Sequence, residues 1–274
     1  MQGLSKNLLT ATAAVLLCVN SAQAGCSRPI VVPAAPTGNS VLIRGDEVRG
    51  VYPDLLRQLG PKYGCEFRFP IVPRARADSM VLDREEGDIL IPASRTADRD
   101  QRAKFVSLVS VAPAVISMKP QQFAPRSLES LLKSGKRAVI VRRFNYGDKY
   151  QAFLAQLEKQ GQVEYAPEIA NVIRMIVNAR ADYSIMAPTL FHSTMMELDD
   201  VKARVDDLSI SVPEDLPLTD SGVYLSTRSL TESDLQLLER LFLDSATGAT
   251  KSAIWQAFVR YYPPSVLKGV QPHR

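Results

Sequence analysis

The chain has 274 residues, of which 46% are hydrophobic and 23% are charged, and its formal net charge is +4. This length suits one large domain or two small ones, and either can bury a sizeable core. The basic residues are spread along the chain without an aromatic-basic stripe, so the sequence predicts no nucleic-acid partner.

Residues 1–24 have the pattern of a cleavable secretory signal peptide. Lys6 precedes an apolar run centred on residues 11–19, and Ala22-Gln23-Ala24 is the small-x-small pattern after which signal peptidase cuts. The run is too short to span a bilayer, and no later stretch reads as a membrane helix. The pattern predicts export to the periplasm and a mature chain that begins at residue 25.

Two cysteines follow the signal peptide, in a compartment where disulfides persist. Cys26 lies just before the apolar run 30–32, and Cys65 lies just before the run 67–69. If these runs are neighbouring parallel strands, both cysteines lie at one end of the sheet, within bridging distance. We therefore predict a Cys26–Cys65 disulfide. The alternative is a lipidated Cys26, against which stands Gln23, where lipoprotein signals usually carry Leu.

Short apolar runs alternate with helical patterns along the rest of the chain, which is typical of α/β folds. The predicted strands are 30–32, 66–69, 88–92, 105–109, 114–118, 138–141, 183–186 and 222–226. The predicted helices, with apolar residues at helical spacing, are 51–59, 77–86, 128–132, 150–157, 169–177, 231–242 and 249–261. Gly60-Pro61 is expected to end the first helix, and Gly87 to cap the second.

Two proline-containing breaks, near 119–125 and 212–217, divide this pattern into three pieces. We expect residues 25–118 and 217–274 to form a first, discontinuous lobe and residues 119–216 to form a second. The chain would then cross between the lobes on two hinge strands, with a cleft between them. Such clefts are where α/β proteins bind small molecules, and a hinge allows closure around a ligand.

Most catalytic signatures are missing from the sequence. His192 and His273 are its only histidines, and there is no phosphate-binding glycine motif, nucleophile elbow or metalloprotease motif. With no histidine pair and no cysteine cluster, we predict no metal, no cofactor and no catalytic residue. We expect His192 at the surface or at a helix cap. An enzyme whose catalytic groups are single carboxylates remains an alternative.

The stretch ASRTADRDQR, residues 93–102, follows a predicted buried strand. It carries hydroxyl groups on Ser94 and Thr96 and a guanidinium group on Arg99. Arginine grips a carboxylate with two parallel hydrogen bonds, and a helix that begins after the strand would also favour an anion. The alternative for Arg99 is a structural ion pair with Asp98 or Asp100. We expect the neighbouring Arg95 and Arg102 to face solvent or to make surface pairs.

Four segments, in this order, resemble the family 3 periplasmic solute-binding proteins, the amino-acid-binding type of ABC transporters. They are RGVYPDLLRQLG, REEGDILIPASRTADRDQRAKF, SLESLLKSGKRAVIVRRFNYGDKY and NARADYSIM. The resemblance implies a type II periplasmic-binding-protein-like fold. Its two α/β lobes would each have a mostly parallel sheet flanked by helices, and two hinge strands would join them. It also implies a small-molecule ligand and a membrane ABC permease as partners.

The resemblance further implies roles for individual residues. Arg99 stands where the family's arginine grips the ligand α-carboxylate, and Ser94 matches the neighbouring hydroxyl, with Thr96 at its offset in the motif. The loop at residues 143–146 matches the second-lobe loop that also contacts the carboxylate. In that loop Asn145 offers an amide donor, and Tyr146 a ring for stacking.

Two departures from the family bear on the ligand. Ala187 stands where members usually have an acid that pairs with the ligand ammonium, and a buried ammonium without such a partner is costly. Arg74 and Arg76 replace a stacking aromatic, and alternation in an extended segment would send both side chains the same way. Arg142 and Arg143 stand across the cleft. The sequence therefore predicts an anionic ligand, a dicarboxylate or an acidic amino-acid-like compound, rather than a cationic amino acid.

The sequence thus favours a periplasmic solute-binding protein that closes on a small carboxylate-bearing solute and delivers it to an ABC permease. One alternative is a dehydratase-type enzyme on the same fold, which needs a general acid in the cleft. Another is a soluble ligand-sensing module that presents its closed form to a receptor.

Overall fold

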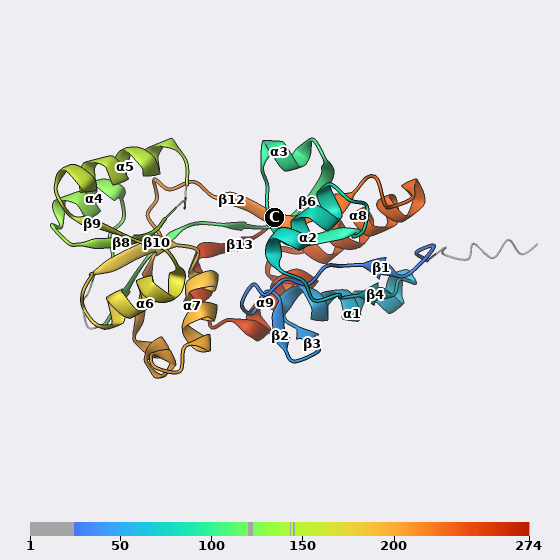
Figure 1. Ribbon diagram of the computed structural model, residues 1–274, viewed down its shortest axis with the longest axis horizontal. Helices are drawn as coiled ribbons and strands as arrows, with labels where there is room; N and C mark the ends of the chain where they lie inside the picture. Colours follow the sequence, from blue (N-terminus) through green and yellow to red (C-terminus); the bar gives the residue numbers. More distant parts are fainter. Residues whose placement is uncertain (1–24, 120–122, 143, 145, 274) are drawn as a thin grey trace, which may run out of the picture.

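The computed structural model describes residues 25–119, 123–142, 144 and 146–273. It confirms the predicted α/β architecture, and Figure 1 shows two groups of strands and helices side by side along the long axis. The signal-peptide pattern at residues 1–24 lies outside the described residues. Within the described ranges, no helix combines the length and the apolar character needed to cross a membrane.

The first lobe is built on a four-stranded sheet in the order β13-β6-β12-β5, counted over the described residues. Its strands are β5 (Ile89–Ser94), β6 (Ala103–Val111), β12 (Thr219–Ser226) and β13 (Val270–Pro272). All three pairings in this sheet are antiparallel, so the expectation of a mostly parallel sheet is wrong for this lobe. The reason is connectivity: β12 enters from the second lobe and runs back between β5 and β6.

A parallel pair, β1 (Ile30–Val31) and β4 (Phe67–Arg68), lies beside this sheet. The two strands are neighbours as predicted, and Cys26 and Cys65 form the expected disulfide at one end of the pair, with their Cα atoms 4.9 Å apart. A short hairpin of β2 (Leu42–Arg44) and β3 (Glu47–Arg49) follows β1; the sequence analysis did not anticipate it.

The helices of the first lobe pack around these strands. They are α1 (Val51–Tyr63), α2 (Arg74–Leu82), α3 (Ala97–Asp100), α8 (Glu232–Ala246) and α9 (Ala253–Tyr261), with 3-10 turns η2 (Ala249–Lys251) and η3 (Val266–Gly269). The prediction that Gly60-Pro61 ends α1 is wrong. Pro61 lies in the last turn, where it removes a single helical hydrogen bond, and the helix ends at Tyr63, with Gly64 as its cap in the left-handed conformation, φ 65°, that favours glycine.

The second lobe is built on a five-stranded sheet in the order β11-β7-β10-β8-β9, again over the described residues. Its strands are β7 (Ala114–Met118), β8 (Ala138–Val141), β9 (Val163–Ala166), β10 (Tyr183–Met186) and β11 (Leu208–Ser211). Its helices are α4 (Leu128–Lys133), α5 (Asp148–Lys159), α6 (Ile169–Val177) and α7 (Pro188–Glu197), with the 3-10 helix η1 (Lys202–Asp207). The sheet is mixed: β8, β9 and β10 run parallel, whereas β7 and β11 pair antiparallel.

The first crossing between the sheets lies earlier than the sequence indicated. Residues 114–118, which the sequence analysis placed with the first lobe, form β7 and pair with β10 and β11 in the second sheet. The break falls at Ala112-Pro113, because the Ala112 N–H still extends the β6–β13 ladder by donating to the Gly269 carbonyl, whereas Pro113 has no N–H to continue it. The chain returns between β11 and β12.

The C-terminal segment makes a further link between the lobes. After α9, η3 lies against α7 of the second lobe, and Gly269 approaches Pro188 so closely that a Cβ there would lie 3.0 Å from the proline ring. β13 then joins the edge of the first sheet through β6. His192 of α7 is buried beside the Tyr262 ring, so its expected surface position is wrong; burial lowers its pKa.

Candidate functional site

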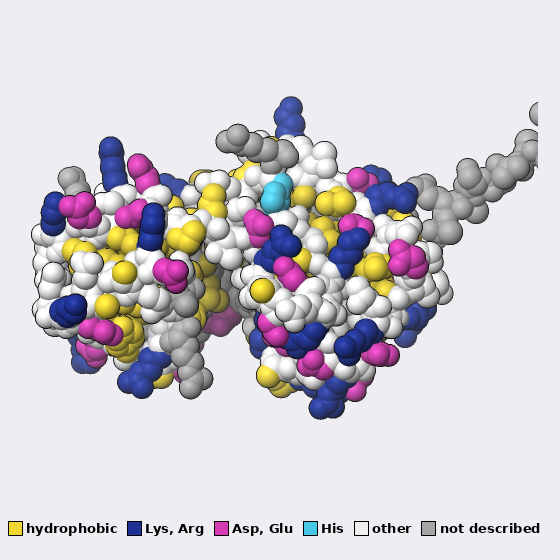
Figure 2. All heavy atoms as spheres, turned by 90° about the horizontal axis from the view of Figure 1, so that it is seen from above, with side chains coloured by type: hydrophobic (Ala, Val, Ile, Leu, Met, Phe, Trp, Pro, Cys, Tyr) yellow, Lys and Arg dark blue, Asp and Glu magenta, His cyan; other side chains and the backbone are white. Residues whose placement is uncertain are grey.

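A cavity of about 590 Å³ lies between the lobes. Figure 2 shows the molecule hollowed between two masses at this place. The first lobe supplies most of the wall, from the loop after β1, the start of α1, α2, the end of β5, β12 and α9. The second lobe contributes Tyr146 and the start of α7, and Pro113 lies at the crossing.

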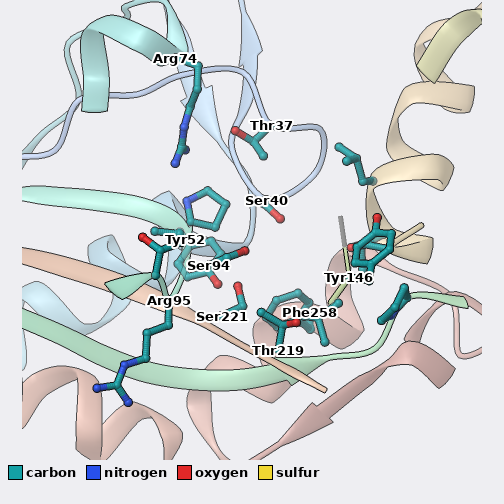
Figure 3. Close-up of a pocket in the computed structure, with 18 of the residues that line it drawn as sticks. Thr37, Ser40, Tyr52, Arg74, Ser94, Arg95, Tyr146, Thr219, Ser221 and Phe258 are labelled. Carbon is teal, nitrogen blue, oxygen red and sulfur yellow. The ribbon is translucent and has the colours of Figure 1, made fainter. Parts of the chain in front are cut away.

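Two arginines of the first lobe share one carboxylate at this cavity. Asp78 accepts a hydrogen bond from Nη2 of Arg99 at 2.8 Å, and Nε of Arg74 lies 3.0 Å from its other oxygen. Burial lowers the pKa of Arg74, Asp78 acts against this lowering, and the charge of Arg99 adds to it. Figure 3 shows Arg74 reaching down toward the cavity. The sequence analysis offered Asp98 and Asp100 as alternative partners for Arg99. In the structure, Asp98 pairs with Arg102 and Asp100 pairs with Arg95.

The end of β5 places Ser94 and Thr96 at the cavity wall. The Ser94 carbonyl accepts a hydrogen bond from Nη1 of Arg99 at 3.2 Å, which helps to orient that guanidinium. The Thr96 hydroxyl caps α3 by accepting the Arg99 backbone N–H. α3 begins after β5, as the sequence analysis expected, but it has only four residues.

Arg95 and Arg102 make the surface pairs that the sequence predicted. Arg95 lies at the cavity rim but points away from it (Figure 3), and its Nε donates to Asp100 at 2.9 Å. Arg102 pairs with Asp83 and Asp98. The charge of Arg95 is therefore balanced outside the cavity.

The structure separates Arg74 from Arg76, which the sequence analysis placed on one side. Both lie on α2, which begins at Arg74 instead of residue 77, and Pro73 precedes it as the N-cap residue. Residues two apart on a helix point about 200° apart, whereas Arg74 and Asp78, four apart, share a face. Arg76 instead pairs with Glu86 at the surface and does not line the cavity.

Of the second-lobe residues that were predicted to bind the ligand, the structure places Tyr146 at the cavity and Arg142 away from it. Tyr146 lines the cavity with its ring packed edge-on against Tyr150, and burial raises the pKa of Tyr146. Arg142 is exposed after β8 and does not line the cavity. Arg143 and Asn145 lie outside the described residues. Ala187 lines the cavity as the N-cap residue of α7, so this position presents a methyl group.

Sequence reasoning missed several polar and aromatic wall residues. They are Thr37, Ser40, Tyr52, Thr219, Ser221, Phe258 and Tyr262. Tyr52 is 1% exposed; burial raises its pKa, and the nearby Ser221 hydroxyl acts against that rise. Tyr52 lies in the first turn of α1 on the same face as Leu55 and Leu56, a pattern that is indistinguishable from core packing in the sequence.

The charge of the cavity wall has one sign. Its described residues include Arg74, Arg95 and Arg99 but no aspartate, glutamate or histidine. In the same part of the chain, no group of histidine, cysteine and acidic residues could hold a metal ion. Arg74 and Arg99 share one carboxylate, so together they keep a positive charge and spare N–H donors that are suited to an anion.

Solved structures show the fold. The chain superposes on the second substrate-binding domain of a putative amino acid ABC transporter from Streptococcus pneumoniae with a TM-score of 0.61, at 12% identity, covering 86% of this chain and 100% of that one. An ancestral amino acid-binding protein, a precursor of cyclohexadienyl dehydratase, gives 0.58 at 12% identity, covering 86% and 95%.

A histidine kinase sensor domain with similarity to periplasmic binding proteins gives a TM-score of 0.58 at 16% identity, covering 90% of this chain and 98% of that one. The chain has the fold of the periplasmic binding proteins. No family model and no curated protein sequence matches it. Hinge closure around a ligand is known in periplasmic binding proteins.

Proposed function

We propose that the protein is a periplasmic solute-binding protein that closes on a small anionic solute and delivers it to an ABC permease. The observation that carries the proposal is the interlobe cavity, whose described wall residues include arginines and no acid or histidine. A dicarboxylate or an acidic amino-acid-like compound fits this wall. A carboxylate can bind Arg99 and Arg74 beside Ser94, while the Tyr52 hydroxyl can donate or accept one hydrogen bond.

Ala187 argues against a cationic amino acid. A ligand ammonium buried against its methyl group would lose its hydration without gaining a carboxylate partner. The arginines on the facing wall would repel a lysine or arginine side chain. The arginines of one wall and the methyl group of Ala187 on the other therefore both favour an anionic ligand.

A ligand screen tests this proposal. The protein is purified, unfolded and refolded to remove bound solute, and screened by thermal shift and calorimetry against dicarboxylates, acidic amino acids, neutral amino acids, lysine and arginine. We expect acids to raise the midpoint of thermal unfolding, because a ligand that binds only the folded state stabilises it. Tight binding of lysine or arginine, with no binding of any acid, contradicts the proposal.

Two other functions share this fold. The sensor domain among the similar structures favours a ligand-sensing module as the second candidate, which would use the same cavity and differ in its partner. An adjacent permease gene and ATPase gene would favour transport over sensing. The relation of the ancestral binding protein to a dehydratase makes turnover of prephenate or arogenate worth measuring, and turnover would replace the binding proposal.

A further inference from the structure

Asp78 pairs with both arginines of the proposed anion site, Arg74 and Arg99. It does not line the cavity itself but lies behind Arg74 and Arg99, with its side chain 29% exposed. One carboxylate oxygen pairs with each arginine, at 3.0 Å and 2.8 Å respectively. Asp78 thus ties together two cationic side chains that come from different segments, α2 and α3.

The bonds to Asp78 leave both guanidinium groups able to bind a ligand. A guanidinium has five N–H donors. Arg99 uses one donor on Asp78 and one on the Ser94 carbonyl, whereas Arg74 forms an ion pair with Asp78 and a hydrogen bond of 3.4 Å to the Ile91 carbonyl. The remaining donors can meet a carboxylate in the cavity while Asp78 stays in place.

Asp78 also sets the charge that a ligand meets. Two guanidinium groups and one carboxylate leave this cluster with one net positive charge. Arg95, the third arginine of the wall, is balanced by Asp100 and points away from the cavity (Figure 3). Without the Asp78 charge, the same two arginines would present two positive charges to the same ligand.

We propose that Asp78 is a specificity-determining residue that limits how much negative charge the site favours, while it positions Arg74 and Arg99. This inference rests on the proposed function, since it assumes an anionic ligand in the cavity. Discrimination between ligands is a difference of affinities, and a partly buried countercharge disfavours a dianion more than a monoanion of the same shape.

The test compares ligand pairs that match in shape and differ by one charge: succinate with succinamate, and glutamate with glutamine. Calorimetry gives the affinity ratio within each pair for the wild type and for Asp78→Asn, which keeps the side-chain volume and one hydrogen-bond acceptor. We expect the ratio to move about tenfold toward the more negative ligand in Asp78→Asn.

Two further variants separate charge from structure. Asp78→Glu keeps the charge and should hold the ratio within about twofold of the wild type. Glu86→Gln removes an acid that pairs with Arg76 at the surface, away from the cavity, and should also leave the ratio unchanged. Thermal unfolding confirms that each variant is folded.

The outcomes distinguish this inference from the proposal on which it rests. An unchanged ratio in Asp78→Asn, or the same change in Glu86→Gln, overturns the role of Asp78 while carboxylate binding stands. Weaker binding of amino acids alone, with succinate unaffected, overturns it too and makes Asp78 the partner of a ligand ammonium. If no member of the series binds the wild type or Asp78→Asn, the proposed function fails and the inference fails with it.

Discussion

The two walls of the cavity differ in how they are held and in what they present. The first-lobe wall is polar and cationic, and its arginines are fixed by hydrogen bonds within the lobe, as Arg99 is by Asp78 and Ser94. The second-lobe wall presents the Tyr146 ring, the methyl group of Ala187 and the side chains of Thr189 and Leu190. Under the proposed function, the first lobe would recognise charge and the second lobe would add contact area.

The largest expected effect is on the charged wall. Arg99→Ala should weaken binding of an acidic ligand about 100-fold, because it removes a charge-assisted pair and leaves Asp78 to repel the anion. Calorimetry with the best acid from the screen measures the change. Arg102→Ala is the matched control, since Arg102 pairs with Asp83 and Asp98 on the surface of the same lobe. Equal losses in both variants would refute a specific role for Arg99.

A smaller effect is expected on the opposite wall. Tyr146→Leu should weaken binding about tenfold by removing a ring that packs over the ligand, and the loss should fall mainly on the dissociation rate. Stopped-flow measurements separate the two rates. Tyr165→Leu provides the control, because Tyr165 lies on β9 and hydrogen-bonds to Glu158 away from the cavity. A change confined to the association rate would show that the comparison between the walls is wrong.

The smallest effect concerns the buried hydroxyl of the first-lobe wall. Tyr52→Phe should weaken binding about fivefold, the contribution of one hydrogen bond, because it removes a buried hydroxyl from the cavity wall. Tyr183→Phe is the control. Its hydroxyl is likewise buried, but it lies in the second-lobe core. Unchanged affinity in Tyr52→Phe would remove Tyr52 from the site.

Elements with strong local patterns were predictable from the sequence. The apolar spacing of α1, α5, α6 and α8 located these helices, and the run before Ser94 located β5. The Cys26–Cys65 disulfide was predictable because each cysteine lies just before a short apolar run. The structure pairs those two runs as parallel strands. β9 and β11 were missed because each mixes buried and less buried residues over only four positions, whereas β8 and β10, of the same length, are buried throughout.

The sequence by itself determined the architecture and most of the chemistry of the ASRTADRDQR corner. Alternating strands and helices, the proline breaks and a strand followed by Ser94 and Arg99 are local signals, carried by residues near one another in the chain. These were enough to predict a two-lobed fold and an arginine beside a cleft.

Only the tertiary structure decided which charges meet at the cavity. Whether Arg74 and Arg76 point together depends on α2 beginning at Arg74, a boundary that local propensity leaves open by several residues. The pairing of Arg99 with Asp78 joins residues 21 positions apart, and Tyr52 reaches the wall because α1 packs against α9. Contacts of this kind depend on how the elements pack, and no spacing along the chain encodes them.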